Sequence, residues 1–421
     1  MAACPSTRTG SPPFESRRHV RDRRPYPQRR SRRRRPAAAL PAARRAALGA
    51  APARVPRRAG NRRGRLPVLR DALHLQGRAA QGASLKILVV APSWIGDCVA
   101  AQPLLRRLHE RHPGAAIDLL APPWVAPLAA RMPEVRGVLD NPLRHGEFGL
   151  LERLRLARRM RVAAYDMAIV LPNSWKSALV PWLAGIPVRV GYTGEARHGL
   201  INRRHRLERG AGSTIAERYA RLADAPGEAA LPDLPQPRLA AEPAQCAATA
   251  ARLGLDGDAA PVALCPGAEY GPAKRWPEEY WARIAGCLAA RGHAVWLIGS
   301  ANDTGIAQAI AAAVPRGCRN LCGRTTLAQA IDLLAIARFV LTNDSGLMHV
   351  AAALDRPMIA LFGSSSPRYT PPLSKNAEVL WLELACSPCF KRECPLGHFR
   401  CMREIQPERV EARLAARLPP P

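Results

Sequence analysis

The 421-residue sequence predicts an α/β protein with two domains, each built around an open parallel sheet. Two observations support this fold class. From Lys86 onward, short apolar runs alternate with amphipathic stretches, which is typical of strand–helix units around a parallel sheet. A segment rich in proline and acidic residues, 224–243, interrupts the alternation, and the same pattern then restarts. We therefore predict domains at 85–255 and 256–421.

The first 84 residues differ in composition from the rest of the chain. They hold 22 arginines against three acidic residues, so +19 of the formal net charge of +30 lies here. This Arg- and Pro-rich composition, without a sustained period, predicts a disordered extension over residues 1–84. We interpret the extension as the result of a translation start assigned too early. A nucleic-acid-binding or anionic-lipid-binding arm and a transit peptide are the alternatives.

The remaining charge of +11 suits anionic partners such as a diphosphate or an acidic membrane surface, and it does not select nucleic acid. The eleven cysteines occur without a signal peptide or an apolar run of about 18 residues. This favours a reducing, cytoplasmic location and argues against a disulfide scaffold. Any contact with a membrane is therefore expected to be peripheral.

The predicted elements follow from the apolar runs and the amphipathic stretches. In the first domain we predict strands at 86–90, 117–121, 167–171 and 188–192, and helices at 99–111 and 152–162. A helical stretch ending at Leu253 precedes the second domain, whose predicted strands are 261–265, 294–299, 339–342 and 358–362. Its predicted helices are 278–290, 304–314, 327–337, 347–354 and a terminal one at 407–418.

The first strand runs directly into the sequence APSWIGD, which ends at Asp97, and a helix follows. Open parallel sheets bind ligands at the carboxyl ends of their strands, so we expect Asp97 to project toward a cleft between the domains. Ser93 and Gly96 lie beside it, and a glycine lets backbone approach a ligand or partner closely. Asp97 is the candidate catalytic residue; the alternative is a helix cap. No G-x-G-x-x-G follows this strand, which disfavours a nicotinamide-dependent dehydrogenase.

In the second domain, the stretch CPGAEYGPAKRW ends a strand and places Lys274 shortly before a predicted helix. A cation on a loop beside a helix N-terminus is suited to phosphate, because its charge acts together with unsatisfied backbone N–H groups. The alternative is that Lys274 is a solvated surface side chain.

The sequence TNDSGLMH, residues 342–349, joins another strand to a helix. Ser345 is placed to cap this helix, and Gly346 leaves its first N–H groups open to an anion, so a diphosphate could dock here without a metal. His349, about one turn into the helix, is placed to donate to a phosphate oxygen. The alternative is that Asp344 and Ser345 only cap the helix and His349 packs internally.

Asn302 and Asp303 follow the strand predicted at 294–299. A carboxylate at this strand end could accept hydrogen bonds from ribose hydroxyls, as acidic residues do in dinucleotide-binding folds. A capping role for Asp303 is the alternative.

Near the C-terminus, Cys386, Cys389, Cys394 and Cys401 form a tight cluster around His398. Four thiolates suit a tetrahedral structural zinc site, and they would leave no open position for catalysis. The later spacings match no standard zinc finger, so structural zinc and free thiols both stay open.

Four stretches of the sequence together resemble the ADP-heptose:lipopolysaccharide heptosyltransferases, and among them heptosyltransferase II. They are KILVVAPSWIGD, LPNSWKSALVPWLAGIPVRVGY, CPGAEYGPAKRWP and TNDSGLMHVAAAL. Their order and spacing agree from Lys86 to about Pro372. The resemblance implies the inverting GT-B fold, with two Rossmann-like domains facing a central cleft. The first would bind the acceptor and the second the ADP-sugar. The extension and the cysteine cluster lie outside the shared catalytic pattern.

The resemblance also implies a reaction. The family moves L-glycero-D-manno-heptose from ADP-heptose to the first heptose of the lipopolysaccharide inner core, here heptosyl-Kdo2-lipid A, at the cytoplasmic face of the inner membrane. Catalysis is expected to need no cofactor, and a monomer is expected. Asp97 would be the catalytic base. The donor would be held by the residues Lys274, Asp344, Ser345, Gly346 and His349, with Glu269 and Asp303 as further members.

Two rival functions follow from the same sequence. Heptosyltransferase I, which acts on Kdo2-lipid A, differs in its acceptor, and the PSWIGD and NSWKSALVP stretches favour the second enzyme over it. A basic nucleic-acid-binding protein is a rival of another class, suggested by the pI of about 11.1. That rival depends on the arginine-rich extension, because the body has no recognisable binding module.

Overall fold

The computed structural model describes residues 84–143, 147–207, 213–228, 231, 233–258 and 261–419. All of them belong to one compact unit of the chain, 62–421. The extension predicted to be disordered lies outside the described residues, except for Ser84.

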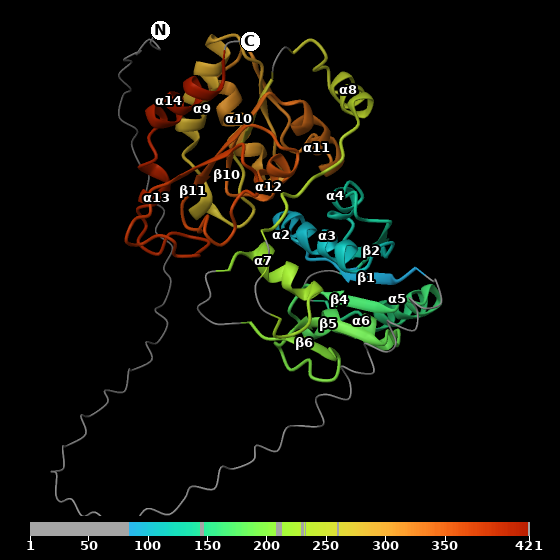
Figure 1. Cartoon of the computed structure of the whole chain (residues 1–421). Coiled ribbons are helices and arrows are strands. Elements are labelled where there is room, and N and C mark those ends of the chain that lie inside the picture. The colour runs from blue at the N-terminus through green and yellow to red at the C-terminus, as the bar shows by residue number, and fades with distance from the viewer. Residues whose placement is uncertain are drawn as a thin grey trace, which may run out of the picture. The chain divides into compact units, whose positions relative to one another are not determined.

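The first six strands form one parallel sheet in the order β3-β2-β1-β4-β5-β6, drawn in blue to green in Figure 1. Strand β1 lies near the centre, paired with β2 on one side and β4 on the other. The carboxyl end of β1 therefore opens into the middle of the sheet edge. The strands are β1 Lys86–Val90, β2 Ala116–Ala121, β3 Gly137–Asp140, β4 Met167–Val170, β5 Val188–Tyr192 and β6 Arg203–His205.

The other six strands form a second parallel sheet in the order β12-β11-β10-β7-β8-β9 (Figure 1). Strand β10 is paired with β11 and β7, so its carboxyl end is also central. All eight predicted strands are confirmed, whereas β3, β6, β9 and β12, the edge strands of the two sheets, were not predicted. The strands are β7 Val262–Cys265, β8 Val295–Leu297, β9 Cys318–Asn320, β10 Phe339–Asn343, β11 Met358–Phe362 and β12 Ala377–Trp381.

The helices largely confirm the amphipathic stretches, with one correction. The helix predicted at 99–111 is two helices, because Pro103 has no backbone N–H and takes a place in the first turn of a new helix. None of the described helices is both long and apolar enough to cross a membrane. The helices are α2 Ile95–Ala100, α3 Gln102–Arg111, α4 Ala126–Ala129, α5 Leu150–Ala163, α6 Trp175–Leu183, α7 Ile215–Ala220, α8 Pro243–Arg252, α9 Glu278–Ala290, α10 Thr304–Ala313, α11 Leu327–Ile336, α12 Gly346–Ala353, α13 Arg400–Arg403 and α14 Pro407–Arg417.

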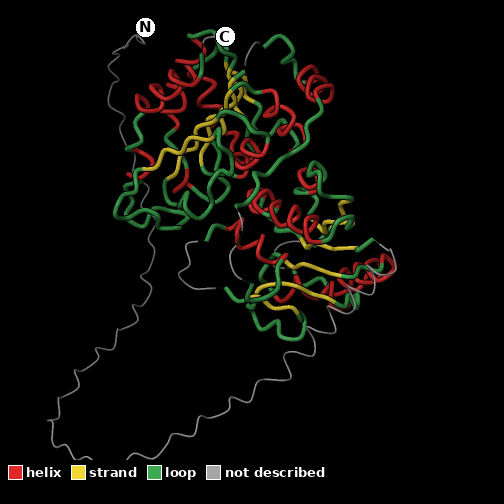
Figure 2. The backbone as a smooth tube through the Cα atoms, viewed as in Figure 1, coloured by secondary structure: helices red, strands yellow, loops and turns green. Residues whose placement is uncertain are grey.

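Helices flank the strands of both sheets, as Figure 2 shows. Side chains alternate between the two faces of a strand, so Ile87 and Val89 of β1 pack with α2 and α3, while Leu88 and Val90 pack with α5 and α6. Strands with both faces covered read as continuous apolar runs, which is why the sequence revealed them. The cluster that holds α2 and α3 continues into α11 and α12 of the second half.

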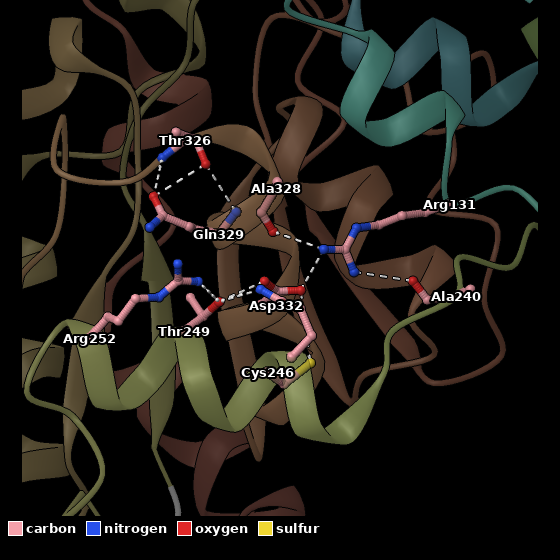
Figure 3. A network of polar contacts seen from close by, with 10 residues as sticks. Arg131, Ala240, Cys246, Thr249, Arg252, Thr326, Ala328, Gln329 and Asp332 are labelled. Atoms are coloured by element: carbon pink, nitrogen blue, oxygen red, sulfur yellow. Dashed lines mark hydrogen bonds and ion pairs between the residues drawn. The ribbon is translucent and has the colours of Figure 1, made fainter. Parts of the chain in front are cut away.

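A buried carboxylate connects segments that are distant in the sequence (Figure 3). Asp332 of α11 accepts hydrogen bonds from Arg131 at 2.5 Å and from Thr249 of α8 at 2.8 Å. Arg131 follows α4 and also donates to the backbone oxygens of Ala240 and Ala328. A buried charge is tolerated only when it is paired and hydrogen-bonded, so this network fixes the segment after α4 against α11.

Candidate active site

The turn between β1 and α2 positions Asp97. Trp94 occupies the N-cap of α2 with extended backbone, and Asp97 is the third residue of the helix. The N-cap makes no side-chain capping hydrogen bond. The alternative that Asp97 is only a helix cap is therefore wrong, and its carboxylate remains available for chemistry.

The carboxylate of Asp97 lies in a largely buried environment. Burial raises its pKa from 3.8 to about 6, against the opposing effect of the Lys274 cation, which lowers it. Among the described residues, no side chain or backbone N–H donates a hydrogen bond to this carboxylate. Burial and the charge of Asp97 also raise the pKa of the neighbouring Cys98 thiol to about 12. Asp97 is thus ionised at neutral pH and more basic than an exposed carboxylate, as a general base requires.

The turn between β10 and α12 has the same position in the second sheet. Ser345 occupies the N-cap of α12, as predicted, but its side chain makes no capping hydrogen bond. Its Oγ instead lies 3.4 Å from Oγ1 of Thr342. The first N–H groups of this eight-residue helix are therefore left without a side-chain cap, which suits an anion.

Lys274 ends the short 3₁₀ helix η2, Pro272–Lys274, and points to the same turn. Its Nζ donates to Oδ2 of Asp344 at 2.6 Å and lies 5.0 Å from the centre of the Tyr270 ring. Asp344 is buried and also accepts a hydrogen bond from Ser365 Oγ. The alternative of a freely solvated surface lysine is therefore wrong, because a buried carboxylate fixes the ammonium group at the N-terminal end of α12.

His349 is buried inside the first turns of α12. Burial lowers its pKa to about 4, with Asp344 opposing this and Lys274 adding to it. The imidazole is therefore neutral at physiological pH and keeps one N–H donor. The internal packing considered from the sequence is present, while donation to a phosphate remains a prediction.

The two turns meet through two glycines. A Cβ on Gly96 would lie 2.7 Å from Cδ2 of His349, and a Cβ on Gly346 would lie 2.9 Å from Cβ of Ile95. The glycine in the first turn therefore permits close approach, as predicted, and the partner is the helix of the other turn. The contact brings Asp97 into electrostatic range of Lys274. The structure thus gathers seven of the predicted site residues, namely Gly96, Asp97, Lys274, Asp344, Ser345, Gly346 and His349.

Glu269 and Asp303, the further residues predicted for the donor site, have different surroundings. Asp303 is buried and accepts from the N–H and the Oγ of Ser300 at 2.9 and 2.8 Å, in a capping box around η3, Ala301–Asp303. The capping role considered from the sequence is therefore present, and a contact of Asp303 with ribose remains a prediction. Glu269 is exposed and accepts from Nδ2 of Asn302 at 3.1 Å. Glu269 is the more accessible of the two carboxylates.

The four clustered cysteines and His398 line one small hollow near the C-terminus. The backbone N–H of Phe399 donates to Sγ of Cys394 at 3.4 Å. Cys386, Cys389, Cys394 and Cys401 are free thiols. Within the described ranges, no three His, Cys, Asp or Glu side chains are arranged as a metal site.

Sequence reasoning missed two parts of the site. The loop after β11 contains the buried Ser364, Ser365 and Ser366, and Ser365 helps to hold Asp344. The buried Asn343 ends β10, donates to the backbone oxygen of Pro266 at 2.7 Å and so ties two loops together. The sequence FGSSSP could have identified the serine loop, because it directly follows a predicted strand, as the other site loops do.

Comparison with known proteins identifies the family of this chain. Residues 153–400, more than half of the chain, match the model for glycosyltransferase family 9 (heptosyltransferase). The lipopolysaccharide heptosyltransferase 2 of Escherichia coli (strain K12) is 44% identical over 343 residues, which cover 79% of this chain and 99% of that protein. The chain belongs to glycosyltransferase family 9. It is therefore a glycosyltransferase of the heptosyltransferase type, as its motifs predicted.

Two further similarities agree with this family 9 assignment. The lipooligosaccharide heptosyltransferase 2 of Haemophilus influenzae is 43% identical over 77% of this chain and 96% of that protein. The solved structure of the E. coli ADP-heptose lipopolysaccharide heptosyltransferase II has a TM-score of 0.72 and 42% identity, over 79% of this chain and 98% of that one. The predicted GT-B fold class is confirmed, and the transferase is favoured over the nucleic-acid-binding alternative.

Proposed function

We propose that this family 9 glycosyltransferase moves L-glycero-D-manno-heptose from ADP-heptose to the first heptose of the lipopolysaccharide inner core, with inversion of the anomeric carbon. The observation that carries the proposal is the meeting of the α2 and α12 turns. It sets a carboxylate with a pKa of about 6 across from a lysine at a helix N-terminus. The names of the similar proteins, heptosyltransferases 2 and an ADP-heptose enzyme, support this donor and this acceptor.

Asp97 acts as the general base in this proposal. Its carboxylate removes the proton of the acceptor hydroxyl while the hydroxyl oxygen attacks the anomeric carbon. The bond from that carbon to the diphosphate breaks on the opposite face, so the configuration is inverted and ADP leaves with the bonding electron pair. A base with a pKa near the working pH serves this step well, and the raised pKa of Asp97 supports the role.

The α12 turn holds the donor diphosphate. Negative charge grows on the leaving phosphate, so Lys274 and the uncapped N–H groups at Ser345 and Gly346 contribute most in the transition state. Asp344 acts through Lys274, because its carboxylate already accepts from the ammonium group. The neutral His349 donates its remaining N–H to a phosphate oxygen.

The nucleoside and the acceptor complete the substrate contacts. Glu269 and Asp303 hold the ribose, with the exposed Glu269 as the stronger candidate. Ser93 and Gly96 border the acceptor hydroxyl on the side of Asp97. In this proposal, the region 85–255 binds the acceptor and the region 256–421 binds the ADP-sugar.

The proposed acceptor, heptosyl-Kdo2-lipid A, fixes where the enzyme works. We place it in the cytoplasm, as a monomer with peripheral contact at the inner face of the inner membrane, without a nucleic-acid partner. The moderate positive charge of the chain after the extension supports contact with acidic lipid head groups.

For the cysteine cluster we propose a structural zinc ion. The shared hollow of Cys386, Cys389, Cys394 and Cys401, and the N–H donated to Cys394, support thiolate ligands here. Metal analysis of the purified protein is the test. One zinc per chain that disappears in a Cys386→Ser, Cys389→Ser variant would support the site, and metal-free active protein would contradict it.

The experiment that tests the proposed function compares two acceptors with ADP-heptose as donor. We expect efficient transfer to heptosyl-Kdo2-lipid A and at least about 100-fold lower kcat/KM with Kdo2-lipid A, because the missing sugar removes binding energy at the acceptor side. Preference for Kdo2-lipid A would instead assign heptosyltransferase I. Transfer to neither acceptor would contradict the proposal.

A further inference from the structure

Four large aromatic side chains are exposed at the carboxyl edge of the first sheet. Trp94 follows β1, Trp124 follows β2, Phe148 follows β3 and Trp175 follows β4. Their exposed fractions are 48%, 48%, 42% and 38%. Burial of such side chains is strongly favourable, and a protein that leaves several of them exposed at a ligand-binding edge commonly uses them for contact.

Trp94 and Trp124 flank the turn that carries the base. Trp94 is the N-cap of α2, three residues before Asp97. The indole Nε1 of Trp124 donates to the backbone oxygen of Ser93 at 2.9 Å, and β1 and β2 are neighbours in the sheet. Both tryptophans therefore lie next to the turn that leads into Asp97.

Phe148 and Trp175 form a second pair, with ring centres 5.7 Å apart and an interplanar angle of 39°. The buried Arg153 holds the backbone on both sides of this pair. Its Nε donates to the oxygen of Phe148 and its Nη1 to the oxygen of Lys176, both at 2.6 Å. These hydrogen bonds from a buried charge fix the segment at Phe148 against the first turn of α6.

A second buried guanidinium fixes the loop before Trp175. Arg197 donates to the backbone oxygen of Pro172 at 2.8 Å and to Oδ1 of Asn173 at 2.7 Å. The N–H of Trp175 donates to Glu195 at 3.2 Å. Phe148 and Trp175 thus lie on braced backbone, and a braced surface loses little freedom when a ligand binds.

We propose that Trp94, Trp124, Phe148 and Trp175 form an aromatic platform that holds the sugar rings of the acceptor. The inference rests on the proposed function, which places the donor on the α12 turn and leaves the first sheet to the acceptor. The face of an aromatic ring carries negative charge density, so it attracts the C–H groups that a pyranose ring presents on its less polar face. The platform determines acceptor affinity and positions the hydroxyl, whereas Asp97 performs the proton transfer.

The test is kinetic, with single Trp94→Ala, Trp124→Ala and Trp175→Ala variants. The KM for heptosyl-Kdo2-lipid A should rise by about tenfold or more in each, while kcat and the KM for ADP-heptose stay within about twofold. Trp94→Phe should recover part of the loss, because it keeps a ring. Thermal melting checks that each variant is folded.

Trp182→Ala is the matched control. Trp182 has a similar exposed fraction, 46%, but lies in the last turn of α6, seven residues and about 10 Å along the helix from Trp175. It should leave the acceptor KM unchanged. An equal rise in KM for Trp182→Ala, or no rise in the three platform variants, would overturn the proposal.

A lipid-free acceptor separates sugar contact from lipid contact. With the deacylated heptosyl-Kdo2 saccharide, the platform variants should lose the same factor as with the lipid-bearing acceptor. A loss confined to the lipid-bearing acceptor would assign the rings to lipid contact and overturn the proposal.

Calorimetric binding of the deacylated saccharide distinguishes a failure of the platform from a failure of the proposed function. If the wild-type protein binds the saccharide without transferring heptose, and Trp94→Ala weakens this binding, only the proposed function is refuted. If the saccharide does not bind, the platform is overturned.

Discussion

The β1–α2 turn and the β10–α12 turn have the same place in their sheets and opposite electrostatics. Each follows a central strand and opens a helix beside a glycine that permits close contact. Asp97 in the first turn has no hydrogen-bond donor among the described residues, and burial raises its pKa to about 6. Asp344 in the second turn accepts from Lys274 and Ser365. One topology therefore supplies a basic carboxylate from the first sheet and a neutralised carboxylate with a fixed cation from the second.

In the proposed mechanism, this difference assigns one partner of the reaction to each turn. A carboxylate without donors is destabilised when it is charged, so it gains by taking a proton from an acceptor hydroxyl. The carboxylate of Asp344, in contrast, already accepts a hydrogen bond from an ammonium group. Asp344 fixes the ammonium group of Lys274 beside uncapped helix N–H groups, where negative charge would develop on ADP in the proposed reaction.

The largest expected effect is the loss of turnover in Asp97→Asn. We expect kcat to fall by about 10³-fold, since general base catalysis contributes 10²–10⁴-fold, while the affinity for ADP measured by calorimetry stays within about twofold. The variant should also be more stable at pH 7. Ionisation of a carboxyl whose folded pKa is raised from 3.8 to about 6 costs stability as the pH rises through this range, by up to about 3 kcal/mol, and asparagine removes that cost. Near-normal turnover would remove Asp97 from the role of base.

Lys274→Ala should affect the donor. We expect the Kd for ADP to rise by about 10- to 100-fold, because a charge-assisted hydrogen bond to phosphate contributes about 1.5–3 kcal/mol. Lys375→Ala, an exposed lysine of the same half, is the matched control and should bind ADP like the wild type. Equal ADP affinity in Lys274→Ala and Lys375→Ala would count against the diphosphate site at the α12 turn.

Gly96→Ala should disturb the contact between the two turns. Its Cβ would lie 2.7 Å from the buried His349 ring, so we expect a loss of about 1–3 kcal/mol in the free energy of unfolding, together with slower turnover. Gly305→Ala in α10 is the control. The space around Gly305 is open, and alanine favours helix over glycine by about 0.5–1 kcal/mol. Urea unfolding of both variants measures the difference, and equal stability would mean that the turns are not in tight contact.

The smallest expected effect concerns the caps of two neighbouring helices. Ser345 makes no capping hydrogen bond at α12, so Ser345→Ala should change the free energy of unfolding by less than about 0.5 kcal/mol. Thr326 caps α11 by accepting from the N–H of Gln329, so Thr326→Ala should cost about 1 kcal/mol. If thermal melting shows Ser345→Ala to be as destabilising as Thr326→Ala, the N–H groups at the start of α12 are not free for an anion.

The sequence predicts the centres of the two sheets far better than their edges. Central strands such as β1 and β10 are covered on both faces and read as apolar runs, whereas β9, with the sequence CRN, is partly exposed and carries no such signal. Helices with regular amphipathic spacing were predicted closely, as α9 shows. The unpredicted α6 contains Pro181, which removes an N–H donor from its interior.

Residue types at strand ends predicted the site, and the three-dimensional contacts did not follow from them. The sequence identified Asp97 and Lys274 as candidates, but their mutual approach depends on Gly96 and Gly346 meeting the other helix across about 250 residues. The capping contacts of Asp303 could not be predicted either, because the sequence pattern does not show which partner a side chain takes. The same holds for the hydrogen bonds by which Arg153 and Arg197 brace the backbone near Phe148 and Trp175.

The pH dependence of kcat/KM for the acceptor tests the base assignment most directly. Asp97 has to be ionised, so kcat/KM should rise with pH and level off, with a midpoint at about 6. His349, with its pKa lowered to about 4, is neutral throughout this range and adds no further limb. In Lys274→Ala the midpoint should move upward, because the cation that lowers the pKa of Asp97 is gone. A wild-type profile that is flat from pH 5 to 7 would contradict Asp97 as the base.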